Sequence, residues 1–169
     1  RRDSPPGGLL ARRLFSLLGP QAKRDRPEVG ILCGNSPLVQ TRMKIGTAIR
    51  NMGPAANTAC IRHCALRAEA IGLDHIWTVD HVAIPPDDAE GSNGRWLDPL
   101  AVTAFFAATT ANVGLGISVL VVPYRPPLPT AKWIASLQEL SGGRLLFGIG
   151  PGWMQAEFTA LGVDRRQRG

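Results

Sequence analysis

An α/β fold with a parallel sheet is predicted by two features of the sequence. Apolar stretches suited to strands alternate with stretches of helical periodicity, and this order repeats four times without an antiparallel hairpin. The clearest repeat lies in residues 113–153, where an apolar run, a helical segment, a Ser-Gly-Gly-Arg turn and a second apolar run follow one another. This is the order of a βαβ unit, whose two strands are parallel. Polar or glycine-rich loops follow these strands, and α/β proteins carry their chemistry in such loops.

The first repeat combines an apolar strand with an amphipathic helix. Residues 44–49 form the predicted strand, and Asn57 or Thr58 can cap the helix, which runs to Ile71. Apolar residues recur along this helix at i, i+3, i+4 and i+7, so one of its faces is suited to the core. Gly72 follows at the position where glycine often ends a helix.

The second repeat contains an unusually long loop. Its strand is predicted at residues 73–79, and residues 80–97 then separate strand from helix, whereas roughly 2–6 residues are usual. Asp98 can cap the helix, with Pro99 in its first turn, and the Ala- and Phe-rich residues 101–111 should pack tightly. The loop is interpreted either as an insertion that faces the substrate or as a flexible surface loop.

The third and fourth repeats are joined by shorter connections. Their predicted strands and helices, in chain order, are residues 113–122, 129–140, 145–149 and 155–161. Gly162 ends the last helix. Arg144 precedes the fourth strand at the end of the sheet away from the chemistry, and we expect it to pair with an acid such as Glu139.

Basic charge is concentrated at the start of the chain. The net charge is +6, but residues 1–42 hold eight of the 19 basic residues and three of the 13 acidic residues. The remaining residues, 43–169, hold 11 basic and 10 acidic residues and are nearly neutral. Pro and Gly also interrupt this leader repeatedly. We therefore expect residues 1–42 to be a disordered or upstream-translated leader, with a natural start at Met43 and a folded domain in residues 43–169. The leader contains no nucleic-acid-binding module, so no specific nucleic-acid partner is expected.

Three further classes are disfavoured by composition. No run of about 20 apolar residues appears, which argues against a membrane-spanning helix. Cys60 and Cys64 lie four residues apart, but no second cluster completes a four-ligand zinc site, so no metal is expected. Three cysteines do not form a disulfide framework, and they indicate a reducing, cytoplasmic location.

Five motifs, taken in order and at their spacing, resemble the luciferase-like monooxygenase family. They are MKIGTAIRNMGP, GLDHIWTVDHVAIP, RWLDPL, GLGISVLVVPYRPPLPTAKWIASLQELSGGRLLFGIGPGW and AEFTALGVDRRQRG. The resemblance covers essentially all residues from Met43 onward and is closest to the F420-dependent branch. It implies a (β/α)8 TIM-barrel type of fold, of which this chain holds about the first four βα units. It also implies the deazaflavin coenzyme F420 as cofactor, with FMN as the alternative.

The same resemblance assigns roles to two residues that follow the second strand. Asp80 is expected to lie against the flavin-type ring, and His81 to face the substrate or the reactive edge of the cofactor; both are candidate catalytic residues. An imidazole is suited to proton transfer or to a hydrogen bond with a substrate oxygen near neutral pH. The alternative is that Asp80 caps the loop and that His81 is solvated.

Two further segments are implied to bind the cofactor. The step Ser118–Val119 matches a non-prolyl cis peptide that backs the ring in similar F420-dependent enzymes; the alternative is an ordinary trans strand. The cluster Gly150, Gly152 and Trp153 is expected beside the ring, although a tight turn with a packing tryptophan would look the same. The cluster lacks the third glycine of a dinucleotide-binding fingerprint.

The functional hypothesis is therefore hydride transfer between F420 and a small organic substrate. A complete barrel takes about 250 residues, and four strands do not close it. We expect the chain to be inactive by itself, with two unpaired edge strands that favour association into a homo-oligomer. The alternatives are an FMN-dependent monooxygenase and a non-catalytic flavin-binding or interaction module.

Overall fold

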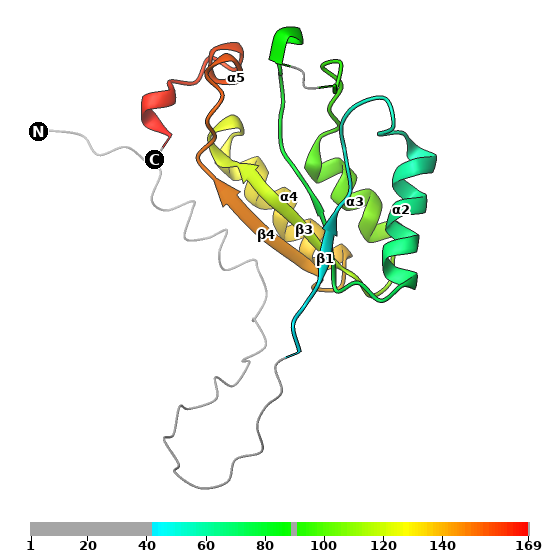
Figure 1. Cartoon of the computed structure of the whole chain (residues 1–169). Coiled ribbons are helices and arrows are strands. Elements are labelled where there is room, and N and C mark those ends of the chain that lie inside the picture. Colours follow the sequence, from blue (N-terminus) through cyan, green and yellow to red (C-terminus); the bar gives the residue numbers. More distant parts are fainter. Residues whose placement is uncertain (1–41, 89–90, 169) are drawn as a thin grey trace, which may run out of the picture. The chain divides into compact units, whose positions relative to one another are not determined.

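A computed structural model describes residues 42–88 and 91–168 as a parallel sheet with helices (Figure 1). The strands are β1 (Gly46–Ala48), β2 (His75–Thr78), β3 (Gly114–Val121) and β4 (Leu145–Gly150). The α-helices are α2 (Thr58–Ala70), α3 (Pro99–Thr109), α4 (Pro127–Leu140) and α5 (Gln155–Ala160). Short 3₁₀ turns are η1 (Pro86–Asp88), η2 (Val122–Tyr124) and η3 (Arg165–Gln167). All four predicted strand–helix repeats are confirmed, and the predicted leader lies outside the described residues except for its last residue.

The strands are ordered β1-β2-β3-β4, and every neighbouring pair is parallel. Thr47 lies opposite Ile76, and Leu115 lies between Ile76 and Leu145 in the register. All four carboxyl ends therefore meet at one edge of the sheet, where α5 also lies (Figure 1). Within the described part of the chain, β1 and β4 each have a single strand neighbour.

Strand β1 is shorter than the predicted residues 44–49. Ile45 is exposed, and its backbone N–H is bound by the Asp74 carboxylate at 2.8 Å rather than by a strand carbonyl. The ladder with β2 begins only at Gly46, opposite His75. Apolar sequence alone therefore predicted more strand than the backbone pairing provides.

Helix ends follow the predicted chemistry closely. The Asn57 side chain accepts the N–H of Cys60 at 2.9 Å, and the Asp98 carboxylate accepts the N–H of Leu100 at 2.8 Å. Gly72 has a φ of +78°, the left-handed conformation that glycine adopts after a helix. No helix in the described residues is long and apolar enough to cross a membrane.

Helices α2, α3 and α4 cover one face of the sheet, and the core lies between them and the strands (Figure 1). Its main cluster joins α2 and α3 to β2 and β3, and fully buried members include Ala65, Ile76, Phe106 and Leu115. Burial of each large side chain is worth roughly 1.5–3 kcal/mol. A separate cluster formed by Val121, Tyr124 and Phe158 attaches α5 to the carboxyl end of β3.

Arg144 does not pair with Glu139, so that prediction was wrong. Its guanidinium binds the Thr110 hydroxyl at 2.9 Å and four backbone carbonyls, those of Ala107, Thr110, Val113 and Ser141. Two of these carbonyls lie at the carboxyl end of α3, where helical carbonyls have no partner within the helix. Arg144 thus joins α3 to the start of β4.

Candidate functional site

A pocket of about 410 Å³ opens at the carboxyl ends of β2, β3 and β4. Its volume lies in the usual range for sites that bind small molecules. The residues that line it include all seven predicted site residues: Asp80, His81, Ser118, Val119, Gly150, Gly152 and Trp153. The remaining lining residues are Val79, Val121, Tyr124 and Pro151. The fold therefore brings the seven residues that were singled out in the sequence together around one pocket.

One wall of the pocket is a bulge in β3. The Ser118–Val119 peptide bond is cis, as the family resemblance implied, and the β3–β4 register shifts between Ile117 and Leu120. Val119 lies against Gly150: a Cβ on Gly150 would lie 2.5 Å from Val119 Cγ2. Glycine is therefore required for β4 to approach the bulge this closely.

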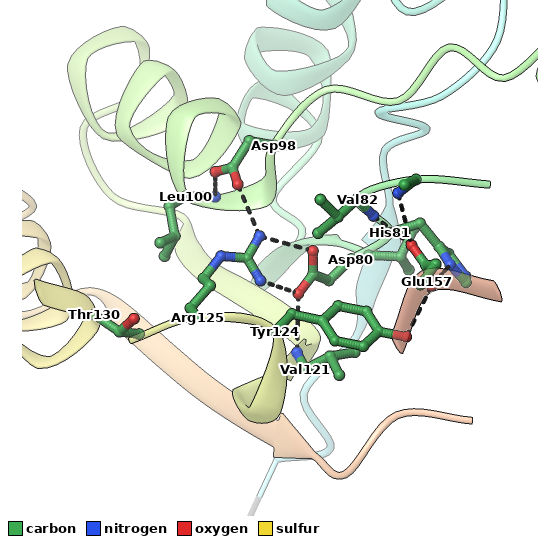
Figure 2. A network of polar contacts seen from close by, with 12 residues as sticks. Asp80, His81, Val82, Asp98, Leu100, Val121, Tyr124, Arg125, Thr130 and Glu157 are labelled. Atoms are coloured by element: carbon green, nitrogen blue, oxygen red, sulfur yellow. Dashed lines mark hydrogen bonds and ion pairs between the residues drawn. The ribbon is translucent and has the colours of Figure 1, made fainter. Parts of the chain in front are cut away.

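The carboxylate of Asp80 is fully buried in a network of polar contacts (Figure 2). Its Oδ2 accepts the Val121 N–H at 2.9 Å, and the Arg125 guanidinium binds both of its oxygens. Arg125 also binds Asp98, the cap of α3, at 2.8 Å. Burial alone would lower the pKa of Arg125, but hydrogen bonds to Asp80 and Asp98 outweigh it and raise that pKa. In this structure the Asp80 side chain joins β2, β3 and α3.

His81 belongs to a second network, centred on Glu157 of α5 (Figure 2). His81 Nδ1 lies 2.8 Å from Glu157 Oε2, and the Tyr124 hydroxyl lies 2.9 Å from the same oxygen. The backbone N–H groups of Val82 and Ala83 donate to Oε1. Burial and the neighbouring Glu157 carboxylate raise the pKa of Tyr124, so this hydroxyl stays protonated and donates its hydrogen bond.

Two tryptophans flank His81. The Trp96 ring centroid lies 4.6 Å from that of His81, and the Trp153 ring meets it edge-on at 6.2 Å. Trp96 ends the long loop, and its backbone bridges Met52 in the loop after β1. This end of the loop therefore lies beside His81. His81 is left partly buried, with 19% of its side chain exposed.

Three residues of these networks were not predicted from the sequence: Tyr124, Arg125 and Glu157. Tyr124 and Arg125 directly follow β3, and barrel sites draw on the carboxyl ends of several strands, which was a usable signal. Glu157 lies in the first turn of the helix after the glycine cluster, but its contact with His81 joins residues 76 positions apart. The described residues contain no group of three or more His, Cys, Asp or Glu side chains that could hold a metal ion.

Comparisons with known proteins identify relatives of this sequence. The sequence is 36% identical over 107 residues to a 5,10-methylenetetrahydromethanopterin reductase of Methanolobus tindarius, covering 63% of this chain and 29% of the relative. It is 36% identical over 101 residues to an F420-dependent glucose-6-phosphate dehydrogenase of Amycolatopsis mediterranei, covering 59% of this chain and 29% of the relative. The chain thus spans under a third of the length of these two relatives.

A solved structure supports the same relationship. The monooxygenase RslO1 from Streptomyces bottropensis superposes with a TM-score of 0.62 and 30% identity, over 75% of this chain and 39% of that one. The four βα units therefore match part of a TIM-barrel enzyme, which confirms the predicted fold class. The sequence model of the luciferase-like monooxygenase family matches residues 41–169. Because this match covers well over half of the sequence, the chain belongs to the luciferase-like monooxygenase family.

Proposed function

We propose that this chain forms the cofactor-facing part of an oxidoreductase that moves a hydride between F420 and a small organic substrate. The proposal rests on one observation: Ser118 and Val119 of the β3 bulge and the partly buried His81 line the same 410 Å³ pocket. The similarity to an F420-dependent glucose-6-phosphate dehydrogenase favours F420 as the cofactor.

The residues of the pocket fit one side of a planar ring. Gly150 has no side chain where the bulge approaches, and Gly152 has a φ of +74°, with Val121 Cγ1 only 2.6 Å from where its Cβ would lie. These two glycines therefore let β4 and the loop after it pack against Val119 and Val121, which line the same pocket. Trp153, which is 65% exposed, offers an aromatic surface at the mouth of the pocket.

A bound deazaflavin would supply the two-electron chemistry, and the protein would orient the reactants and handle the proton. When a substrate carbon that carries a hydroxyl loses a hydride, the hydroxyl must also lose a proton for a carbonyl to form. His81 lies in the pocket and is the side chain suited to accept that proton and to return it in the reverse direction. Asp80 has a buried, fully bonded carboxylate, so we assign it a positioning role.

A second candidate is an FMN-dependent monooxygenase. It is favoured by the 30% identity to the monooxygenase RslO1 over three quarters of this chain. The same wall and glycine cluster would face the FMN ring. This candidate predicts that binding selects FMN over F420 and that activity consumes oxygen.

Titration of the purified chain with F420 and with FMN, followed by absorbance and fluorescence, tests the proposal. We expect F420 to bind more tightly than FMN. His81→Asn should keep F420 binding but lower any turnover by roughly 10²–10⁴-fold, the usual contribution of a general acid or base. His63→Asn, on the exposed face of α2, is the matched control and should change neither F420 binding nor turnover.

Three outcomes would contradict the proposal in different ways. Tighter binding of FMN would favour the monooxygenase. Failure of both cofactors to bind, with an associated and colourless protein, would favour a non-catalytic module. Measurable turnover that is equal in wild type and His81→Asn would remove the proposed role of His81.

We also propose a cytosolic location and a small-molecule substrate. Cys60 and Cys64 are free thiols, which is the state that a reducing compartment maintains.

A further inference from the structure

We infer that Glu157 is a positioning residue that fixes the tautomer of His81. By holding the proton on Nδ1, it leaves Nε2 as the nitrogen that can accept a proton from a molecule in the pocket. The inference deepens the proposed role of His81, and it assigns a role to a residue of α5 outside the predicted site.

The inference rests on the four hydrogen bonds of the Glu157 carboxylate. Its Oε1 accepts the backbone N–H groups of Val82 and Ala83, which can only donate. Its Oε2 accepts from the Tyr124 hydroxyl at 2.9 Å and lies 2.8 Å from His81 Nδ1. Three of the four partners are thus donors, and the fourth is the imidazole nitrogen.

Glu157 must be an acceptor towards His81. Burial opposes the charge on Glu157, but hydrogen bonds from Ala83, Val82, His81 and Tyr124 outweigh it and hold the pKa of Glu157 below its usual value. An ionised carboxylate has no proton to donate, so the proton between the two groups belongs to Nδ1. In a neutral imidazole the other nitrogen then carries the free lone pair.

The surroundings of the ring leave Nε2 available. His81 lines the pocket, and Nε2 has no hydrogen-bond partner within residues 42–88 and 91–168. Trp96 and Trp153 contact the ring through their aromatic faces and edges, and their centroids lie 4.6 and 6.2 Å away. Glu157 itself has no exposed surface, so it acts on the pocket through the side chains that it binds there, His81 and Tyr124.

The Glu157→Gln variant provides a sharp test because its amide has one acceptor and one donor end. The backbone N–H groups of Val82 and Ala83 require the amide oxygen, so the NH₂ group would face Tyr124 and His81. His81 Nδ1 would then have to accept a hydrogen bond, and the proton would move to Nε2.

Nitrogen-15 NMR of the histidine side chains, at a pH where the rings are neutral, reads the tautomer directly. The chain has three histidines, and the spectrum of His81→Asn identifies the His81 signals by their loss. We expect wild type to show a protonated Nδ1 and an unprotonated Nε2, and Glu157→Gln to show the reverse. Tyr124→Phe removes another hydrogen bond to the same carboxylate oxygen and should leave the wild-type tautomer unchanged.

Each outcome decides the inference without cofactor or substrate, so its failure is separate from failure of the proposed function. A wild-type spectrum with the proton on Nε2 would overturn it, and this measurement needs no variant to fold. A folded Glu157→Gln that keeps the wild-type tautomer would also overturn it. A tautomer change in Tyr124→Phe would show that the network as a whole, rather than Glu157, sets the proton position.

Discussion

Asp80 and His81 are neighbours in the chain, yet their side chains have opposite surroundings. The Asp80 carboxylate has no exposed surface and is bound by Arg125 and Val121, whereas His81 is partly exposed to the pocket. The residue that stabilises the strand ends is thus distinct from the residue suited to proton transfer.

Asp80→Asn should strongly destabilise the protein. It removes the charge opposite Arg125, whose side chain is only 13% exposed, and breaking a buried pair by removing one partner costs roughly 3–5 kcal/mol. Urea unfolding followed by circular dichroism measures this loss. Asp164→Asn also removes a carboxylate that faces an arginine, but that pair is at the surface and the midpoint should not move. An unchanged midpoint in Asp80→Asn would show that the Arg125 pair is not needed for stability.

Single residues of the site differ in how far the sequence predicts them. Asp80 and His81 directly follow an apolar strand, a position that points to an α/β site and that the family motif reinforces. Glu157 has no such local signature, because its role depends on α5 docking beside the loop after β2. The sequence led us to expect an ion pair between Arg144 and a nearby acidic residue. The backbone carbonyls at the end of α3 bind Arg144 instead.

At the scale of elements, local chemistry fixes helix starts better than strand lengths. Asn57 and Asp98 cap their helices through side-chain contacts that span only two or three residues, so the sequence alone predicts them. Strand β1 depends on pairing with β2, and the bulge in β3 depends on β4, so neither can be read from a single segment. The cis bond at Ser118 was implied only by family resemblance.

The two helix caps should differ in their importance. Asn57→Ala removes one capping contact of α2 and should cost about 1 kcal/mol. Asp98→Ala should cost more, because Asp98 caps α3 and also binds Arg125 at 2.8 Å. Denaturant unfolding of both variants measures the difference.

A second experiment repeats both substitutions in an Asp80→Asn background. The loss of unfolding free energy caused by Asp98→Ala should then change, because both carboxylates share Arg125, while the loss caused by Asn57→Ala should not change. If the two substitutions lowered the unfolding free energy equally, and by the same amounts in the Asp80→Asn background, the contact of Asp98 with Arg125 would not contribute to stability.

For the whole molecule, the open edges of the sheet are the dominant feature. Within the described residues β1 and β4 each lack a second neighbour, and β4 exposes Phe147 and Ile149. Unpaired strand edges are templates for further pairing. We therefore predict that the chain associates through these edges.

Light scattering after size exclusion checks this prediction. The wild-type chain should elute with a mass of at least two copies. Ile149→Lys places a charge on the edge strand and should shift the chain towards a monomer. Leu128→Lys is the matched control, because Leu128 is exposed to a similar degree, 59% against 61%, but lies on α4. A monomeric wild type, or equal effects of the two lysines, would contradict the prediction.

Helix α5 has only six residues, and an isolated helix of that length is unstable in water. Its place is held by tertiary contacts, among them Phe158 in the cluster with Tyr124 and Glu157 at His81. A local unfolding event confined to α5 would release the His81 ring while the sheet stayed intact. The proton transfer proposed for His81 is thus linked to the folding equilibrium of one short segment, and a ligand that requires a fixed His81 would slow hydrogen exchange in α5.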